Sequence, residues 1–188
     1  VDKTTDCLYW GDVGPDAGKN GVDRGSKGYD FWGRACEAGY YGWPLFRGNH
    51  IYFDYNFATK KSGPLFDPDK PINDSPFNTG LRELPPLKSP LIWYSYDESL
   101  EFPWVKTGGK NPMAGPIFSR QLAVESWQSV FGKDKAPNVF PEYFDGKFFI
   151  YEWMRNWIYV VTMDENGKFV QADPFLPNES FSRPMDMA

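Results

Sequence analysis

The residue types that commonly carry metal or redox chemistry are scarce in this chain. It has one histidine, His50, and two cysteines, Cys7 and Cys36. A structural zinc site needs four ligands, so metal chemistry based on Cys and His is excluded, whereas a hard cation held by carbonyl and carboxylate oxygens is not. The two cysteines allow one bridge within the chain. The sequence is compatible both with a disulfide and with two buried free thiols.

The elements that must position such residues are predicted to be short strands and long loops. Residues 7–13 are aromatic and bounded by Asp6 and Gly14–Pro15, which is typical of a buried strand that ends in a loop. Residues 16–28 are polar and contain four glycines. A loop of this length in a compact domain is more often functional than idle. Residues 29–38 are predicted to form a short helical or extended piece.

The middle of the chain is a long excursion over residues 45–90 that is punctuated by Pro and Asn and accommodates only brief strands. We predict an ordered insertion wrapped on a scaffold. A strand at 91–96 follows, and a second buried segment is predicted at 113–118 after a Gly108–Gly109 turn. The aromatic side chains available to anchor the insertion are Phe46, Tyr52, Phe53, Tyr55, Phe57, Phe66 and Phe77.

The clearest supersecondary signal lies at residues 140–171. Strands are predicted at 147–153, 157–163 and 168–170, separated by short polar turns, which makes an antiparallel meander. The meander has aromatic side chains on both faces and must be covered on both sides, as in a sandwich or a propeller blade.

Composition narrows the fold class. The 188 residues include 8 Trp, 11 Tyr and 16 Phe, together with 18 Gly and 17 Pro. That much Gly and Pro excludes a helical bundle or a coiled coil. The aromatic content supplies enough apolar surface to offset chain entropy, which argues against disorder. We therefore expect an all-β, loop-rich protein with an aromatic core.

Charge and hydropathy exclude two classes of partner. The formal net charge is -5 and the charges are dispersed, with no polybasic run beside a stacking aromatic residue, so nucleic acid is excluded as a partner. No stretch approaches the roughly 20 apolar residues that a membrane helix requires. The first residues have no charged and apolar signal pattern, so a signal peptide is expected to be absent or already removed.

Several motifs together resemble the soluble glucose/sorbosone dehydrogenase family. They are YWGDVGPDA at 9–17, GYD at 28–30 and GYYGWP at 39–44. Residues 140–150 and 182–186 resemble the last blades of the same family. The insertion and the WMR segment after residue 152 look like the branch found in large multidomain secreted bacterial proteins.

Members of this family are six-bladed β-propellers that oxidise sugars with pyrroloquinoline quinone (PQQ) and calcium. The resemblance implies that residues 1–188 are one segment of such a propeller, built of antiparallel β-meanders, with the 45–90 insertion. It further implies a secreted or periplasmic protein whose partners are a sugar or other carbohydrate and the remaining blades or further domains. A blade takes roughly 40 to 45 residues, so the chain would hold about three blades, too few to close a ring.

The resemblance also implies a metal group. In the family, backbone carbonyls of a Gly-Pro pair bind the calcium that holds PQQ, and Gly14 and Pro15 match that pair. A rigid Gly-Pro turn can point carbonyl oxygens at a hard cation, although a plain turn at a strand end is the alternative. Asp30 matches the first residue of an Asp-Glu pair that holds a second calcium, but Phe31 stands where Glu is expected. Tyr41 is assigned to the metal group by position, with packing under the turn as its alternative role.

Basic residues that embrace the quinone carboxylates match in part. Met154 occupies the position of the family lysine, and Arg155 follows it directly. Arg155 can supply the missing charge, because a guanidinium binds carboxylate bidentately. Arg183 matches the first arginine of the family Arg-x-Arg-Asp motif, whereas Met185 stands on the second. We therefore assign Arg155 and Arg183 to cofactor binding, the alternative for Arg155 being a turn residue in solvent.

The catalytic base of the family has no counterpart in this chain. That base is a histidine well upstream of the Gly-Pro turn, and only 13 residues precede Gly14. His50 follows the Gly-Trp-Pro element and is interpreted as a surface histidine or one that anchors the insertion. No catalytic residue is therefore predicted in this chain.

Two functions emerge as hypotheses. The first is a segment of a PQQ- and calcium-dependent sugar or aldose dehydrogenase. The second is a non-catalytic propeller that binds carbohydrate or protein through the 45–90 insertion, suggested by the missing Glu, lysine and arginine and by aromatic residues that could stack on sugar rings. A purely structural module of a large secreted protein is a third possibility.

Overall fold

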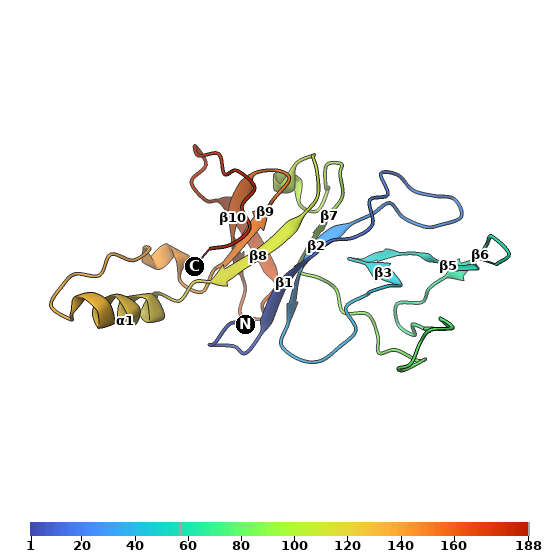
Figure 1. Cartoon of the computed structure of the whole chain (residues 1–188), viewed down its shortest axis with the longest axis horizontal. Helices are drawn as coiled ribbons and strands as arrows, with labels where there is room; N and C mark the ends of the chain where they lie inside the picture. The colour runs from blue at the N-terminus through green and yellow to red at the C-terminus, as the bar shows by residue number, and fades with distance from the viewer. Residues whose placement is uncertain (57, 188) are drawn as a thin grey trace. The chain divides into compact units, whose positions relative to one another are not determined.

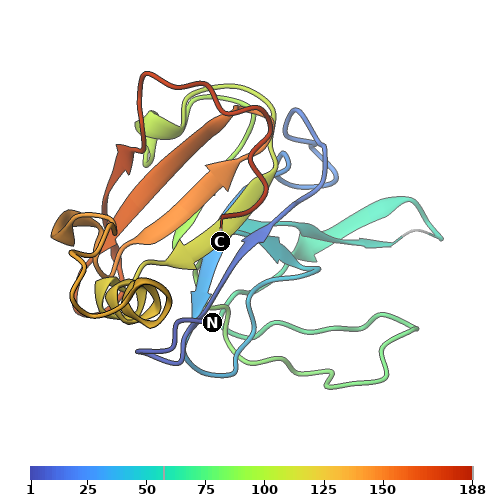
Figure 2. The ribbon, with the colours of Figure 1, turned by 60° about the vertical axis from the view of Figure 1, so that its left-hand side comes forward.

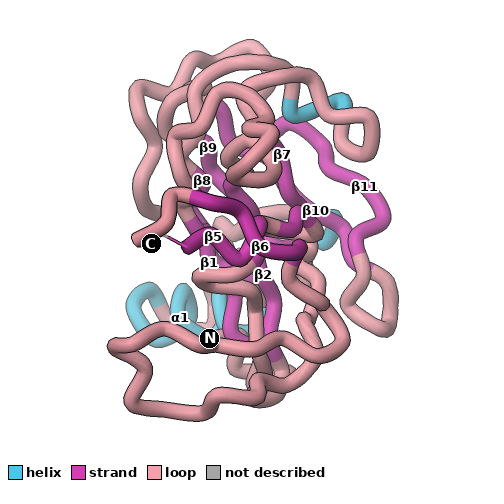
Figure 3. The backbone as a smooth tube through the Cα atoms, turned by 90° about the vertical axis from the view of Figure 1, so that its right-hand side faces the viewer, coloured by secondary structure: helices cyan, strands magenta, loops and turns pink. Residues whose placement is uncertain are grey.

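The computed structural model describes residues 1–56 and 58–187 and is mostly β, with antiparallel sheets (Figure 1). The chain divides into two compact units, Val1–Pro112 and Met113–Ala188, which we describe separately. The expectation of a mostly β, loop-rich chain is confirmed. Figure 3 shows how much of the backbone between the strands is loop. In the described part of the chain, no helix is long and apolar enough to cross a membrane.

The first unit is built on a three-stranded antiparallel sheet in the order β1-β2-β7. Its strands are β1 (Leu8–Asp12), β2 (Asp30–Ala35) and β7 (Ile92–Tyr94). The strand predicted at 7–13 is confirmed, and the segment predicted at 29–38 as helical or extended is extended. Trp32 and Tyr94 are fully buried and stack with their ring centroids 5.0 Å apart, so the aromatic pair holds β2 and β7 together.

Close contact between β1 and β2 depends on a glycine. Trp10 and Gly33 are register partners, and a Cβ atom at Gly33 would lie 2.4 Å from the Trp10 ring. The indole therefore lies across the neighbouring strand at a position where no larger residue fits without a shift.

The insertion forms only short strands, as the sequence predicts. Its hairpins are β3 (Phe46–Arg47) with β4 (His50–Ile51), and β5 (Phe53–Asn56) with β6 (Lys61–Leu65). A short 3-10 turn at Pro103–Val105 follows β7.

Two of the predicted anchoring aromatics behave differently from each other. Phe46 is fully buried and contacts Phe66 edge to face at 6.3 Å. Phe77, in contrast, is 88% exposed, so its predicted anchoring role is wrong. The side-chain amide of the next residue, Asn78, donates hydrogen bonds to the carbonyl oxygens of Asn73 and Leu81. These bonds hold the loop together, so the Phe77 ring is not needed for packing. Phe57 lies outside the described residues.

The second unit is a four-stranded antiparallel sheet in the order β11-β10-β9-β8 (Figure 2). It consists of β8 (Pro112–Ile117), β9 (Phe148–Glu152), β10 (Trp157–Met163) and β11 (Phe169–Pro174). The meander predicted at 140–171 is confirmed. Every residue of β9 is buried, in keeping with a central strand covered on both faces. The apolar core of this unit includes Phe149, Tyr151, Ile158 and Val160.

One α-helix, α1 (Arg120–Phe131), occurs in the described chain and was not predicted. Ser119 caps its N-terminus by accepting a hydrogen bond from Leu122 N, and Gly132 ends it at a φ of 90°. A 3-10 turn at Glu142–Phe144 precedes β9. The Ser and Gly that delimit α1 are the usual helix start and stop signals. The helix has no fully buried residue, and its sequence accordingly has only a weak apolar stripe.

Candidate functional site

The first candidate site lies where the chain leaves β1 and enters β2, around the ammonium group of Lys110. Lys110 Nζ donates hydrogen bonds to Asp30 Oδ1 at 2.7 Å and to the carbonyl oxygen of Pro15 at 3.3 Å. It also lies 4.7 Å from the centroid of the Tyr96 ring. The side chains of Lys110 and Asp30 are both completely buried. We call Gly14, Pro15, Asp30 and Lys110 the ammonium cluster.

Two glycines allow the backbone to close around this cluster. A Cβ atom at Gly14 would lie 2.0 Å from the carbonyl oxygen of Tyr29, and one at Gly28 would lie 1.6 Å from that of Pro15. Because neither position admits a side chain, the turn can approach Asp30 closely, and Gly14 N donates to Asp30 Oδ1 at 2.9 Å.

Asp30 is the residue of the cluster whose pKa is shifted by its surroundings. Burial raises the pKa of Asp30, while the hydrogen bond and positive charge of Lys110 and the Gly14 amide oppose that rise. Asp30 Oδ2 is buried and has no hydrogen-bond partner in the described part of the chain. The carboxylate is therefore charge-paired through one oxygen only.

The structure brings together three of the four residues assigned to the metal group, but it does so around an ammonium. Pro15 O and Asp30 Oδ1 both face Lys110 Nζ. Calcium takes six to eight oxygen ligands. Within residues 1–56 and 58–187 no group of three or more His, Cys, Asp or Glu side chains could hold a metal ion. With the positive charge of Lys110 at its centre, the ammonium cluster does not fit a calcium ion.

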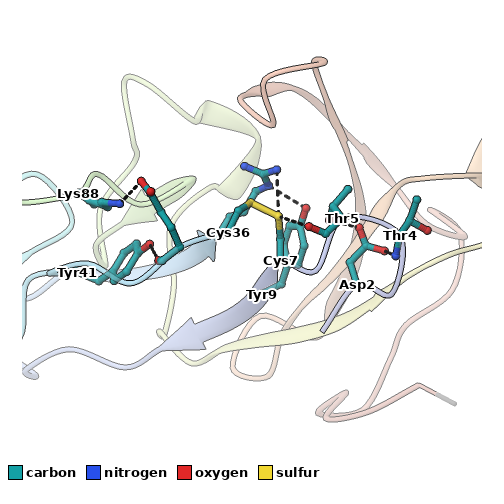
Figure 4. Close-up of a disulfide and its surroundings, with 10 residues drawn as sticks. Asp2, Thr4, Thr5, Cys7, Tyr9, Cys36, Tyr41 and Lys88 are labelled. Carbon is teal, nitrogen blue, oxygen red and sulfur yellow. Dashed lines mark hydrogen bonds and ion pairs between the residues drawn. A yellow bond between two sulfur atoms is a disulfide. The ribbon is translucent and has the colours of Figure 1, made fainter.

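Tyr41, the fourth residue assigned to the metal group, lies elsewhere. Its hydroxyl donates to the carbonyl oxygen of Glu37 at 3.0 Å, and its ring contacts Trp10 edge to face at 5.2 Å. Tyr41 lines a surface pocket next to the Cys7–Cys36 disulfide (Figure 4). The disulfide joins β1 and β2 at one end of their pairing, whereas Asp30 lies at the other end.

The disulfide resolves the alternative that the sequence leaves open. Cys7 is buried, whereas Cys36 is exposed and lines the same pocket as Tyr41. Arg34 donates to Cys7 Sγ at 3.4 Å and to the Tyr9 hydroxyl at 2.9 Å. The bridge therefore belongs to a small polar network that fastens the two strands.

The second candidate site is an exposed indole supported from beneath. Trp43 is 61% exposed, and the Arg47 guanidinium lies 4.1 Å from the centroid of its ring. The Arg47 side chain is 5% exposed and pairs with Asp12 at 3.3 Å. Gly42, at a φ of 110°, accepts a hydrogen bond from Phe46 N at 2.7 Å, which fixes the backbone conformation just before Trp43. We call Trp43, Arg47 and Asp12 the Trp43 platform.

The Trp43 platform adjoins the ammonium cluster. A Cβ atom at Gly14 would lie 3.4 Å from Arg47 Cδ, so the Gly14–Pro15 turn packs against the Arg47 stem. Arg47 Nε is buried and makes no hydrogen bond to any residue that the structure describes. The platform thus combines an exposed aromatic face with a partly exposed carboxylate.

His50 lies opposite Arg47 in the β3–β4 hairpin and stacks on Tyr29 with ring centroids 3.4 Å apart. It is half-buried, and its Nε2 atom has no hydrogen-bond partner among the described residues. Burial lowers the pKa of His50, so the imidazole is neutral at pH 7. The stacking agrees with the interpretation that His50 anchors the insertion.

The two arginines assigned to cofactor binding meet at one turn of the second unit. Arg155 N donates to Glu152 Oε2 at 2.5 Å in the β9–β10 connection. Arg183 N donates to Asn156 Oδ1 at 3.0 Å, and the Arg183 guanidinium lies 4.6 Å from the centroid of the Trp153 ring. The backbones of both arginines therefore lie at one turn, and the Arg183 guanidinium is stacked on an aromatic ring.

No protein-family model, curated protein or solved structure matches this chain. The function of the chain is therefore inferred from the geometry of the ammonium cluster and the Trp43 platform.

Sequence reasoning missed Lys110, Arg47 and Asp12 as site residues. Lys110 is 80 positions from Asp30 and Arg47 is 35 from Asp12, so only tertiary folding brings these charges together. Apart from the Gly108–Gly109 turn just before it, no local pattern marks Lys110.

Proposed function

We propose that this chain is a carbohydrate-recognising segment of a propeller-like β-protein, and that the sugar binds on the Trp43 platform. The observation that carries the proposal is an indole that is 61% exposed yet held from beneath by a nearly buried guanidinium. The expected setting is the six-bladed propeller of the resembling family, with the four-stranded sheet of the second unit as one blade.

The chemistry of the Trp43 platform suits a sugar ring. The apolar C–H face of a pyranose packs on a flat aromatic surface, and its hydroxyls need charged or polar partners at the rim. Asp12, whose side chain is 31% exposed, can accept a hydrogen bond from a sugar hydroxyl at the rim of the platform. Because Trp43 is already held by Arg47, little side-chain entropy would be lost on binding.

The test is a glycan array followed by calorimetry with the best ligand. Trp43→Ala should weaken binding by about 2 kcal/mol, or about 30-fold, as for other central aromatic contacts. Phe77→Ala is the matched control, because Phe77 is a more exposed aromatic residue far along the insertion and should leave affinity unchanged. Unchanged binding by the Trp43 variant, or a loss shared by the Phe77 variant, would refute the proposal.

A second candidate function is a segment of a PQQ- and calcium-dependent sugar or aldose dehydrogenase. It is favoured by the position of Arg155 and Arg183 at one turn of the second unit. Its calcium would have to be held outside the ammonium cluster, which does not fit that ion. The disulfide fits a secreted or periplasmic protein.

This second candidate is tested on the full-length protein with PQQ and calcium. Quinone binding with dye-linked sugar oxidation would support it, and the absence of both would exclude it. Sugar binding without quinone binding would leave the carbohydrate-recognition proposal standing alone.

A further inference from the structure

The ammonium cluster supports an inference that is independent of sugar binding. We infer that the Lys110 side chain is a built-in cation, which holds the Gly14–Pro15 turn on β2 in the position where a metal ion would otherwise be required. The turn is then structurally independent of calcium, in contrast to what the resemblance implies.

The hydrogen-bond inventory of Lys110 supports this inference. An ammonium has three N–H donors. Lys110 directs them to Asp30 Oδ1 at 2.7 Å, to Pro15 O at 3.3 Å and to the face of Tyr96 at 4.7 Å. Two hydrogen-bond acceptors and one aromatic face therefore surround the ammonium, although the side chain is completely buried.

The partners of Lys110 are the kinds of group that bind hard cations. A backbone carbonyl and a carboxylate are typical calcium ligands. Here they come from the end of β1 and the start of β2, and the cation joining them comes from the segment before β8. A covalently attached ammonium at this point links three segments whatever the concentration of free metal ions.

The charge balance of the cluster agrees with a monovalent cation. Asp30 and Lys110 are a one-to-one pair with completely buried side chains. The nearby carboxylate of Asp16 accepts a hydrogen bond from the Tyr96 hydroxyl at 2.5 Å. Asp16 is therefore paired with the tyrosine and not with the Lys110 ammonium. A divalent ion added to this group would face the Lys110 charge with a single buried carboxylate to compensate it.

The first experiment measures the thermal midpoint of the whole chain with excess calcium and with EDTA, together with terbium luminescence sensitised by the aromatic residues. The wild-type midpoint should be the same in both solutions, and terbium emission should stay at the level of free terbium. A calcium-dependent rise in the midpoint that disappears in Asp30→Asn would overturn the inference.

The second experiment removes the built-in cation and supplies another. Lys110→Ala should lower the thermal midpoint, and ethylammonium should restore part of the loss by occupying the vacated position. Lys27→Ala is the control, since Lys27 pairs at 2.5 Å with the exposed Asp97 and should show neither a large loss nor rescue. A folded Lys110→Ala protein with the wild-type midpoint, or one that calcium restores and ethylammonium does not, would contradict the inference. If Lys110→Ala does not fold, the wild-type calcium and terbium titrations decide.

Discussion

Replacing Lys110 with methionine should destabilise the first unit more than any other single change of a charged residue there. Methionine keeps the length and apolar stem of lysine but has no ammonium. Asp30, completely buried, would keep only the Gly14 amide as a partner for its charge, because its Oδ2 atom has no hydrogen bond among the described residues. Breaking a buried pair by removing one partner costs about 3–5 kcal/mol, and we expect a loss in that range.

The assay is urea denaturation of the whole chain followed by tryptophan fluorescence. Lys110→Met/Asp30→Asn should recover much of the loss, since a neutral amide oxygen at position 30 can still accept from Gly14 N without a buried charge. Lys27→Met is the control, because its ion pair with Asp97 is exposed and worth about 1 kcal/mol or less.

The pH dependence gives a further check on the same variant. Burial already raises the pKa of Asp30 above its ordinary value of 3.8. Without Lys110 the folded state holds the Asp30 proton still more tightly than the unfolded state does. The contribution of Asp30 to the stability of the variant is therefore greatest below pH 3.8 and is lost as the pH rises through the folded-state pKa, by at most about 1.4 kcal/mol per pH unit. A Lys110→Met variant that is no less stable than Lys27→Met, or no more sensitive to rising pH than the wild type, would refute this reasoning.

Two other predictions concern groups outside the ammonium cluster. The Cys7→Ala/Cys36→Ala variant loses a bridge with a sequence separation of 29, so its free energy of unfolding, measured in urea, should fall by about 3–4 kcal/mol. A reductant should lower the stability of the wild type only. An equal effect of the reductant on the variant would contradict the assignment of the disulfide. Burial lowers the pKa of His50 below 6.5, so the unfolded state binds the proton more readily and stability should be lost as the pH falls below 6.5. His50 is the only histidine, so its imidazole proton resonance titrates without overlap; a midpoint at or above 6.5 would show the buried placement to be wrong.

The strands were the part of this fold that sequence patterns predict well. Aromatic and β-branched runs such as 157–163 mark buried strands, and the turns between them are short and polar, so the meander of the second unit follows from local signals. The helix α1 was missed because none of its residues is fully buried, and a weakly amphipathic segment gives a weak periodic signal.

The candidate sites were predictable only in part. The structure brings Gly14, Pro15 and Asp30 together, whereas the motifs of the resembling family assign Asp30 to a second calcium site. The same motifs assign Tyr41, which lies beside the disulfide at the other end of the β1–β2 pair. Lys110 escaped prediction because a buried lysine has the same local sequence signature as an exposed one. Its role is set by a partner 80 residues away in the chain.

The disulfide also determines how this chain would carry mechanical load. Tension applied between the residues before Cys7 and those after Cys36 passes through the sulfur–sulfur bond and bypasses residues 8–35. That shielded loop contains β1, the Gly14–Pro15 turn and Asp30. Stretching the oxidised chain would therefore leave the β1–β2 pairing unstressed, whereas the same pull on the reduced chain would act directly on its hydrogen bonds.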